Sequence, residues 1–128
     1  MNNVMDYLYL KWVDNDTNEK YVLGALCRDK ANNVYYFKLN EDYLNKAKKC
    51  GFSTATLPFD DVNRIYESRI LFPLFRVRVP DIENYDDESV DELLAEYDMD
   101  EYDEFEFLRK TKGVSMTDNF ILEEERDN

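Results

Sequence analysis

Apolar side chains alternate with other residues over the first third of the chain, which is the pattern of β-strands. In DYLYLKWVDND, residues 6–16, Leu8, Leu10 and Trp12 occupy alternate positions, and an Asp-Asn-Asp run supplies turn residues. Two further apolar segments, 20–28 and 34–39, are separated by the polar turn KANN. The pattern predicts a meander of three antiparallel strands, a sheet that typically packs one face on helices.

The period changes after residue 39, where the sequence NEDYLNKAKKCGF indicates a short helix. Asn40 is a capping residue, and Glu41 and Asp42 follow it at the end where the helix dipole favours acids. Three lysines come near the other end, and Gly51 is placed to end the helix. Signals at both ends thus agree on one helix between Asn40 and Gly51.

Prolines divide the middle of the chain into short pieces. Pro58, Pro73 and Pro80 interrupt residues 53–81, which show no regular period. We expect the apolar residues of this stretch to be largely buried, namely Ile70, Leu71, Phe72, Leu74, Phe75, Val77 and Val79.

Two amphipathic helices are predicted in the acidic segment that follows. Its apolar residues recur at spacings of three and four, which favours helices at about 88–97 and 101–110. Ser89 or Asp86 can cap the first helix, and Asp100 can cap the second. Lys110, Lys112 and Gly113 are suited to close it.

The end of the chain contains one more candidate strand, SMTDNFILEEE. The predicted fold class is therefore α+β, with a small antiparallel sheet of about three to five strands packed with about three short helices. We expect one domain over residues 1–122 and a charged tail at 123–128, for which disorder is one alternative.

Charge narrows the classes of partner. The 128 residues include 29 acidic and 16 basic ones, giving a net charge of −13. That sign disfavours direct binding to nucleic acid or to anionic membranes. Between Asp81 and Phe107, 14 of 27 residues are acidic and none is basic. An aromatic content of 15% nevertheless favours a folded protein over an acidic disordered one.

The two cysteines and the N-terminal segment favour a cytoplasmic protein. Cys27 and Cys50 show no close pairing pattern and are predicted to be free thiols in a reducing compartment. The apolar stretch near the N-terminus is short, is interrupted by Lys11 and lacks a basic leader, so we expect neither a signal peptide nor a membrane span.

Few residues suit catalysis or cofactor binding. The chain has no histidine and three glycines, too few for a phosphate-cradling or dinucleotide-binding loop. Asp98 and Asp100 begin like a calcium loop, but Tyr102 stands at the third ligand position and the required glycine is missing. The sequence therefore predicts a protein that is not an enzyme and that has no catalytic, cofactor-binding or metal site.

The acidic segment has two interpretations. It forms solvated helix faces, or it presents negative charge to a basic surface of a protein partner. In the second case the carboxylates also resemble the phosphates of DNA, as in inhibitors that occupy nucleic-acid clefts. The candidate partner-binding residues are Asp86, Asp87, Glu88, Asp91, Glu92, Glu96, Asp98, Asp100, Glu101, Asp103 and Glu104.

Several segments between residues 20 and 122 resemble the small N-terminal module of HipA-type kinases, and more closely a related bacterial module found ahead of HIRAN domains. The matching positions are Gly24, then Tyr66, Ser68 and Leu71 to Phe75, then Leu108, Arg109, Thr111, Gly113, Thr117, Asp118, Asn119 and Phe120. Lys112 departs from the pattern, because it stands beside Gly113 where the family has a glycine pair.

The resemblance implies a noncatalytic module. No kinase lobe or HIRAN domain follows before residue 128, so we expect either a free-standing subunit or a fragment of a longer protein. In HipA-type toxin–antitoxin systems such a detached module regulates a kinase-like toxin, whereas HIRAN relatives point to DNA-processing or defence enzymes. The alternative is an acidic DNA mimic from a phage or mobile element that inhibits a nuclease such as a restriction or CRISPR effector. The oligomeric state stays open.

Overall fold

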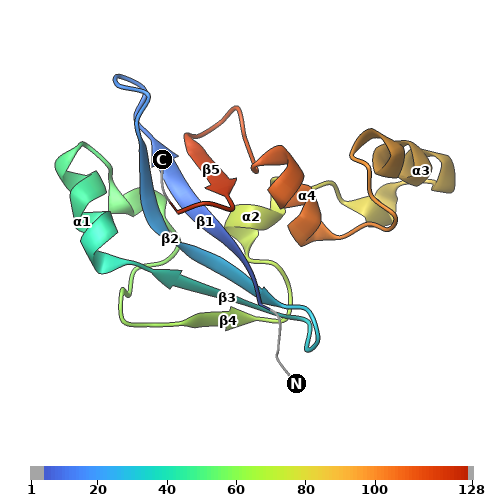
Figure 1. The fold of residues 1–128 in the computed structure, drawn as a ribbon, viewed down its shortest axis with the longest axis horizontal. Coiled ribbons are helices and arrows are strands. Elements are labelled where there is room, and N and C mark those ends of the chain that lie inside the picture. The colour runs from blue at the N-terminus through green and yellow to red at the C-terminus, as the bar shows by residue number, and fades with distance from the viewer. Residues whose placement is uncertain (1–4, 127–128) are drawn as a thin grey trace.

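Five antiparallel strands form one sheet in the computed structural model, which describes residues 5–126 (Figure 1). The strands are β1 (Met5–Val13), β2 (Lys20–Asp29), β3 (Val34–Leu39), β4 (Tyr66–Ser68) and β5 (Phe120–Glu123). Their order across the sheet is β4-β3-β2-β1-β5. The predicted α+β class and the meander of the first three strands are confirmed.

The last strand pairs with the first, so that β1 lies inside the sheet. Leu10 of β1 is opposite Leu122 of β5, although 112 positions separate them in sequence. β5 begins at Phe120, later than the predicted segment, and it includes Glu123 from the expected tail. Residues 127 and 128 of that tail lie outside the described residues.

The helices are α1 (Glu41–Lys49), α2 (Pro73–Arg76), α3 (Asp87–Glu96) and α4 (Glu104–Thr111), with 3₁₀ turns at Thr54–Thr56 and Ile82–Asn84. The signals read from the sequence hold for α1. The side chain of Asn40 accepts a hydrogen bond from the backbone N–H of Tyr43 at 3.0 Å, and Gly51 adopts a φ of 106° just after the helix.

The start of α4 differs from the prediction. The helix begins at Glu104, and its cap is Asp103 instead of Asp100. The Asp103 carboxylate accepts from the backbone N–H of Phe105 at 2.9 Å and is also held by Arg28, a partner that the local sequence pattern does not contain. For α3 the cap is Asp86, one of the two predicted residues, which accepts from the N–H of Ser89 at 2.8 Å.

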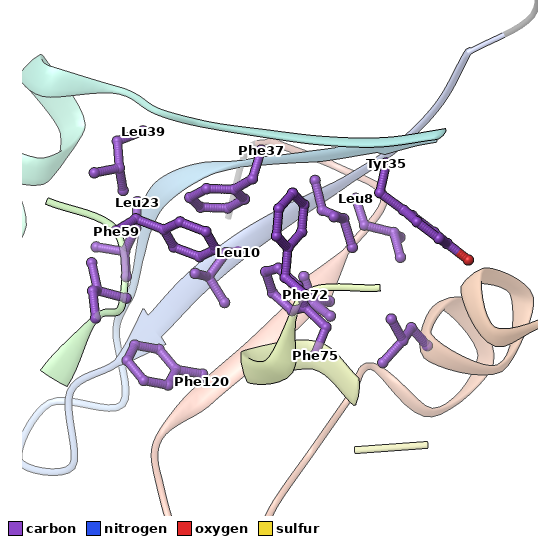
Figure 2. Close-up of a cluster of buried hydrophobic side chains, with 14 of the residues drawn as sticks. Leu8, Leu10, Leu23, Tyr35, Phe37, Leu39, Phe59, Phe72, Phe75 and Phe120 are labelled. Carbon is purple, nitrogen blue, oxygen red and sulfur yellow. The ribbon is translucent and has the colours of Figure 1, made fainter. Parts of the chain in front are cut away.

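One face of the sheet carries the hydrophobic core (Figure 2). Aromatic rings fill its centre, with the ring centroid of Phe37 4.2 Å from that of Phe59 and 5.7 Å from that of Phe75. Helices α1, α2 and α4 contribute Leu44, Phe75 and Leu108 to the same cluster. Burying such rings stabilises a fold more than any other side-chain class does.

The expectation of burial was wrong for two residues of the middle segment. Ile70 and Val77 are 62% and 80% exposed, whereas Leu71, Phe72 and Phe75 are buried. Neither exposed residue belongs to a helix or strand, since Ile70 lies between β4 and α2 and Val77 follows α2, so no helical or strand period directs them toward the core.

Strand β2 contains a β-bulge next to Gly24, and the close packing of β3 at this point requires a glycine. The pairing with β1 shifts between Leu10 and Lys11, so that Leu23 and Gly24 both lie opposite Leu10. A Cβ atom on Gly24 would lie 2.5 Å from the carbonyl oxygen of Lys38 and 2.9 Å from the ring of Phe37. Only glycine fits there without moving β3.

Candidate functional site

Helix α3 forms because its first turn suits negative charge. Asp86 caps the helix, and Asp87 and Glu88 follow at the end where the helix dipole is positive. The hydrogen bonds from Ser89 hold the pKa of the Asp86 carboxyl below its ordinary value. The N-terminal end of α3 is therefore stabilised by the acids that also give it its charge.

Helix α3 stands away from the sheet (Figure 1). None of its residues is buried, and its apolar residues Val90, Leu93 and Leu94 are only partly covered. The ring of Tyr97, just after the helix, packs edge-on against Phe107 of α4 with centroids 4.8 Å apart. The helix is thus attached through its C-terminal end, and most of its surface faces solvent.

Nine of the eleven candidate acids are exposed, namely Asp86, Asp87, Glu88, Asp91, Glu92, Glu96, Asp98, Asp100 and Glu101. Within residues 5–126, none of these nine carboxylates pairs with a lysine or arginine. These nine residues all lie in the segment 86–101 and are exposed, and we call them together the α3 surface.

Asp103 does not belong to the α3 surface. Its Oδ1 atom lies 2.5 Å from Nη1 of Arg28, a side chain that is 7% exposed, and Arg28 also pairs with Asp6. Burial raises the pKa of the Asp103 carboxyl, but the hydrogen bond and charge of Arg28 outweigh it, so the pKa falls below its ordinary value. Asp103 holds α4 to the sheet.

Glu104 is half-buried beside Asp103 and faces a different environment. Burial raises the pKa of its carboxyl, the charge of Arg76 opposes that rise, and the neighbouring Asp103 adds to it. The net result is a pKa above the ordinary value. Glu104 is thus partly withdrawn from solvent, unlike the nine residues of the α3 surface.

The residues that carried the family resemblance have structural roles. The hydroxyl of Tyr66 accepts from the backbone N–H groups of Asp60 and Asp61 at 3.1 and 3.0 Å and so fixes a turn. Asp118 pairs with Arg78 at 2.5 Å, and Arg78 also donates to the carbonyl of Gly113 at 2.7 Å. Arg78, 2% exposed, was not singled out from the sequence.

Lys112 occupies the family's glycine position in a left-handed conformation, with a φ of 61°. A glycine adopts that conformation without strain, whereas lysine does so at a cost of about 1 kcal/mol. The Nζ atom of Lys112 lies 3.0 Å from Oε2 of Glu123, so the side chain gains an ion pair that glycine cannot form.

In the described part of the chain, no group of three or more His, Cys, Asp or Glu side chains is arranged to hold a metal ion. No helix there is both long and apolar enough to cross a membrane. Cys27 and Cys50 are free, the former half-buried and the latter exposed.

These features define a small α+β domain with a packed sheet and a projecting acidic helix. A family model of the HipA N-terminal domain matches residues 17–114. The chain belongs to this family. No curated protein and no solved structure matches it. The match does not extend to HIRAN domains, and that association stays a prediction.

Proposed function

We propose that this chain is a non-enzymatic, cytoplasmic interaction module that binds and regulates a protein partner through the α3 surface. A kinase-like toxin of a toxin–antitoxin system is the partner that family membership favours, because HipA-type modules are linked to such kinases. A DNA-processing or defence enzyme is the second class of partner.

The observation that carries this proposal is the isolation of α3. Nine exposed carboxylates gather there without an ion pair in residues 5–126, and no residue of the helix is needed in the core. Because α3 contributes little to the core, folding alone does not explain why so many of its charged residues are acidic. Charge of one sign at this density attracts a basic surface over about 10 Å at ordinary ionic strength.

Capture from the host lysate tests the proposal. The tagged protein is immobilised, washed at low and then at high salt, and the released proteins are identified by mass spectrometry. A kinase-like protein released by salt supports the regulatory module. If a nuclease is released instead, and duplex DNA competes with the module for it, the DNA-mimic alternative replaces the proposal.

Charge reversal then tests the surface on the captured partner. Glu88, Asp91, Glu92 and Glu96 are changed to Lys together, and we expect association to slow by at least about tenfold and its salt dependence to flatten. The control variant carries the same change of net charge on scattered exposed acids, Asp16, Glu41, Glu67 and Glu125. Equal rates for the two variants would exclude α3 as the contact surface.

A further inference from the structure

A cleft of about 650 Å³ lies between the sheet and two connecting segments, residues 79–83 before α3 and residues 101–104 leading into α4. Its sheet side comes from residues within 28–35, which include the turn between β2 and β3, from residues 69–71 between β4 and α2, and from Arg76 at the end of α2. Its helical side comes from the 3₁₀ turn Ile82–Asn84 and from residues 101–104. The volume is in the range of ligand-binding pockets in general, about 300–1,000 Å³.

The sheet side of the cleft is basic. Lys30, Arg69 and Arg76 line it, and all three are exposed. In a chain with a net charge of −13, most cations would be expected to find a carboxylate. Among the described residues, however, no side chain of these three forms an ion pair or donates a hydrogen bond.

The helical side is acidic. Asp81, Glu83, Glu101 and Glu104 line it, and none of them forms an ion pair in the part of the chain that the structure describes, whereas Asp103, which also lines it, pairs with Arg28. Arg76 and Glu104 line the same cleft, and the charge of Arg76 opposes the rise in the pKa of Glu104. Opposite charges thus lie across the cleft at more than the 4.0 Å that defines an ion pair.

Between the charged sides the cleft offers apolar surface and fixed hydroxyl groups. Ile70, 62% exposed, lies at its rim together with Val79 and Pro80. Tyr102 is held by a hydrogen bond from its hydroxyl to the carbonyl of Pro80 at 3.2 Å, and Tyr35 is 6% exposed. Tyr102 and Tyr35 are therefore held in place inside the cleft, and the charged side chains at its rim are free to contact a ligand.

We propose that this cleft binds an extended peptide segment of a partner protein, with an acidic side chain against Arg69 and Arg76 and a basic side chain against Glu83 and Glu101. This inference rests on the proposed function, because the peptide segment would belong to the same partner protein that the α3 surface attracts. An arginine pair suits a carboxylate, since guanidinium groups bind it in a forked geometry.

The composition of the cleft favours a two-signed occupant over a singly charged one. Apart from the paired Arg28 and Asp103, the lining contains four carboxylates and three cations, so a phosphate or another multiple anion would meet the four carboxylates and a purely basic segment would meet the three cations. A ligand that carries one negative and one positive charge, separated by a neutral stretch, is attracted to both sides of the cleft and repelled by neither. The neutral stretch would lie on Ile70 and Tyr102.

Matched peptides test the cleft before the partner itself is identified. Four capped pentapeptides, EAVAK, KAVAE, EAVAE and KAVAK, are titrated to about 5 mM, a range that detects weak sites, into the ¹⁵N-labelled protein. We expect one of the two mixed peptides to shift the amide signals of Lys30, Ile70 and Tyr102 and to bind at least about tenfold more tightly than KAVAK or EAVAE.

Variants on both sides confirm the placement. Because Arg69 and Arg76 are exposed and unpaired in residues 5–126, changing both to Glu leaves the core intact, which thermal unfolding verifies, and lowers the affinity at least about tenfold. Glu101→Lys is the matching change on the acidic side. A variant with Glu88 and Glu92 changed to Lys, on α3, serves as control and binds the mixed peptide as before.

Four outcomes overturn the inference. The first three are no binding by any peptide, equal binding of all four, and shifts confined to other amides. Shifts of the cleft amides that depend on protein concentration without peptide would identify a second copy as the occupant and also overturn it. None of these outcomes decides whether the α3 surface binds the partner, because the charge-reversal experiment on the captured partner tests that proposal separately.

Discussion

The guanidinium of Arg28 and the carboxylate of Asp103 meet at 2.5 Å, between Nη1 and Oδ1, and join β2 to the first turn of α4. Arg28 is 7% exposed, and its guanidinium carbon also lies 4.9 Å from the ring centroid of Phe105. Arg28 also pairs with Asp6 at 2.9 Å, so removing Asp103 leaves the desolvated guanidinium with one of its two carboxylates.

Asp103→Ala should lower the free energy of unfolding by about 2 kcal/mol, because it leaves the buried Arg28 with one carboxylate, Asp6, instead of two and removes the cap of α4. Urea denaturation measures the change. Asp100→Ala is the matched control, since Asp100 is exposed and has no ion pair in residues 5–126, and it should change stability by less than about 0.5 kcal/mol. Similar losses in both variants would contradict the structural role of Asp103.

Gly24→Ala should destabilise the protein by about 2–3 kcal/mol, because the added methyl group would collide with the backbone of β3. Gly51→Ala separates this effect from backbone strain. Gly51 has a φ of 106° but nothing within 4 Å of an added Cβ, so its replacement should cost only about 1 kcal/mol. Both values come from chemical denaturation. A Gly24→Ala variant as stable as the parent would exclude the close approach of β2 and β3.

Glu123 should make stability depend on pH in the acid range. Burial raises the pKa of this carboxyl, but hydrogen bonds from Lys11, Lys112 and Lys20 outweigh that and lower the pKa from 4.5 to about 2. Because the folded pKa is the lower one, the stabilisation is present above pH 4.5 and is lost as pH falls toward 2. Glu123→Gln should therefore cost about 1–2 kcal/mol at neutral pH, and the difference should vanish near the folded pKa.

Urea denaturation at several pH values measures this difference. Glu125→Gln is the control, since Glu125 is exposed and forms no ion pair within the described residues. A gap between parent and Glu123→Gln that stays constant from neutral to strongly acid pH would show that the lysines do not hold this carboxylate.

The two thiols should differ in reactivity. Burial raises the pKa of Cys27 to about 11, so little thiolate exists there at mildly alkaline pH, whereas Cys50 is exposed. We expect iodoacetamide to modify Cys50 at least about tenfold faster than Cys27. Mass spectrometry follows both sites, and Cys50→Ser should abolish the fast phase. Equal rates at the two sites would mean that Cys27 is not covered.

Local signals predicted the parts of the fold that depend on near neighbours. The strands at 20–29 and 34–39 follow from alternation and turn residues, and α1 follows from Asn40 and Gly51 at its two ends. The family resemblance also came from short motifs such as the one around Tyr66, and a family model confirms it over residues 17–114. Each of these features can be read within a window of about a dozen residues.

Features that depend on distant partners could not be predicted in that way. Asp100 was predicted as the cap of the second helix, but the cap is Asp103, which is held by Arg28, 75 positions away. Arg78 and Asp118 are 40 positions apart, and the sequence around either residue does not indicate that the two form a pair. For the candidate sites, the run of acids was visible in the sequence, but the cleft was not, because Lys30, Arg69 and Glu101 come from three separate segments.

The pairing of β5 with β1 sets an order in which the molecule can assemble. β1, β2 and β3 are joined by short turns and can pair as soon as they are synthesised, whereas β1 meets β5 only after residue 123 has left the ribosome. Until then one side of β1 offers unpaired backbone groups to any passing strand. The nascent chain is therefore most prone to aggregation in the interval before β5 arrives, and its last strand acts as the closing step of folding.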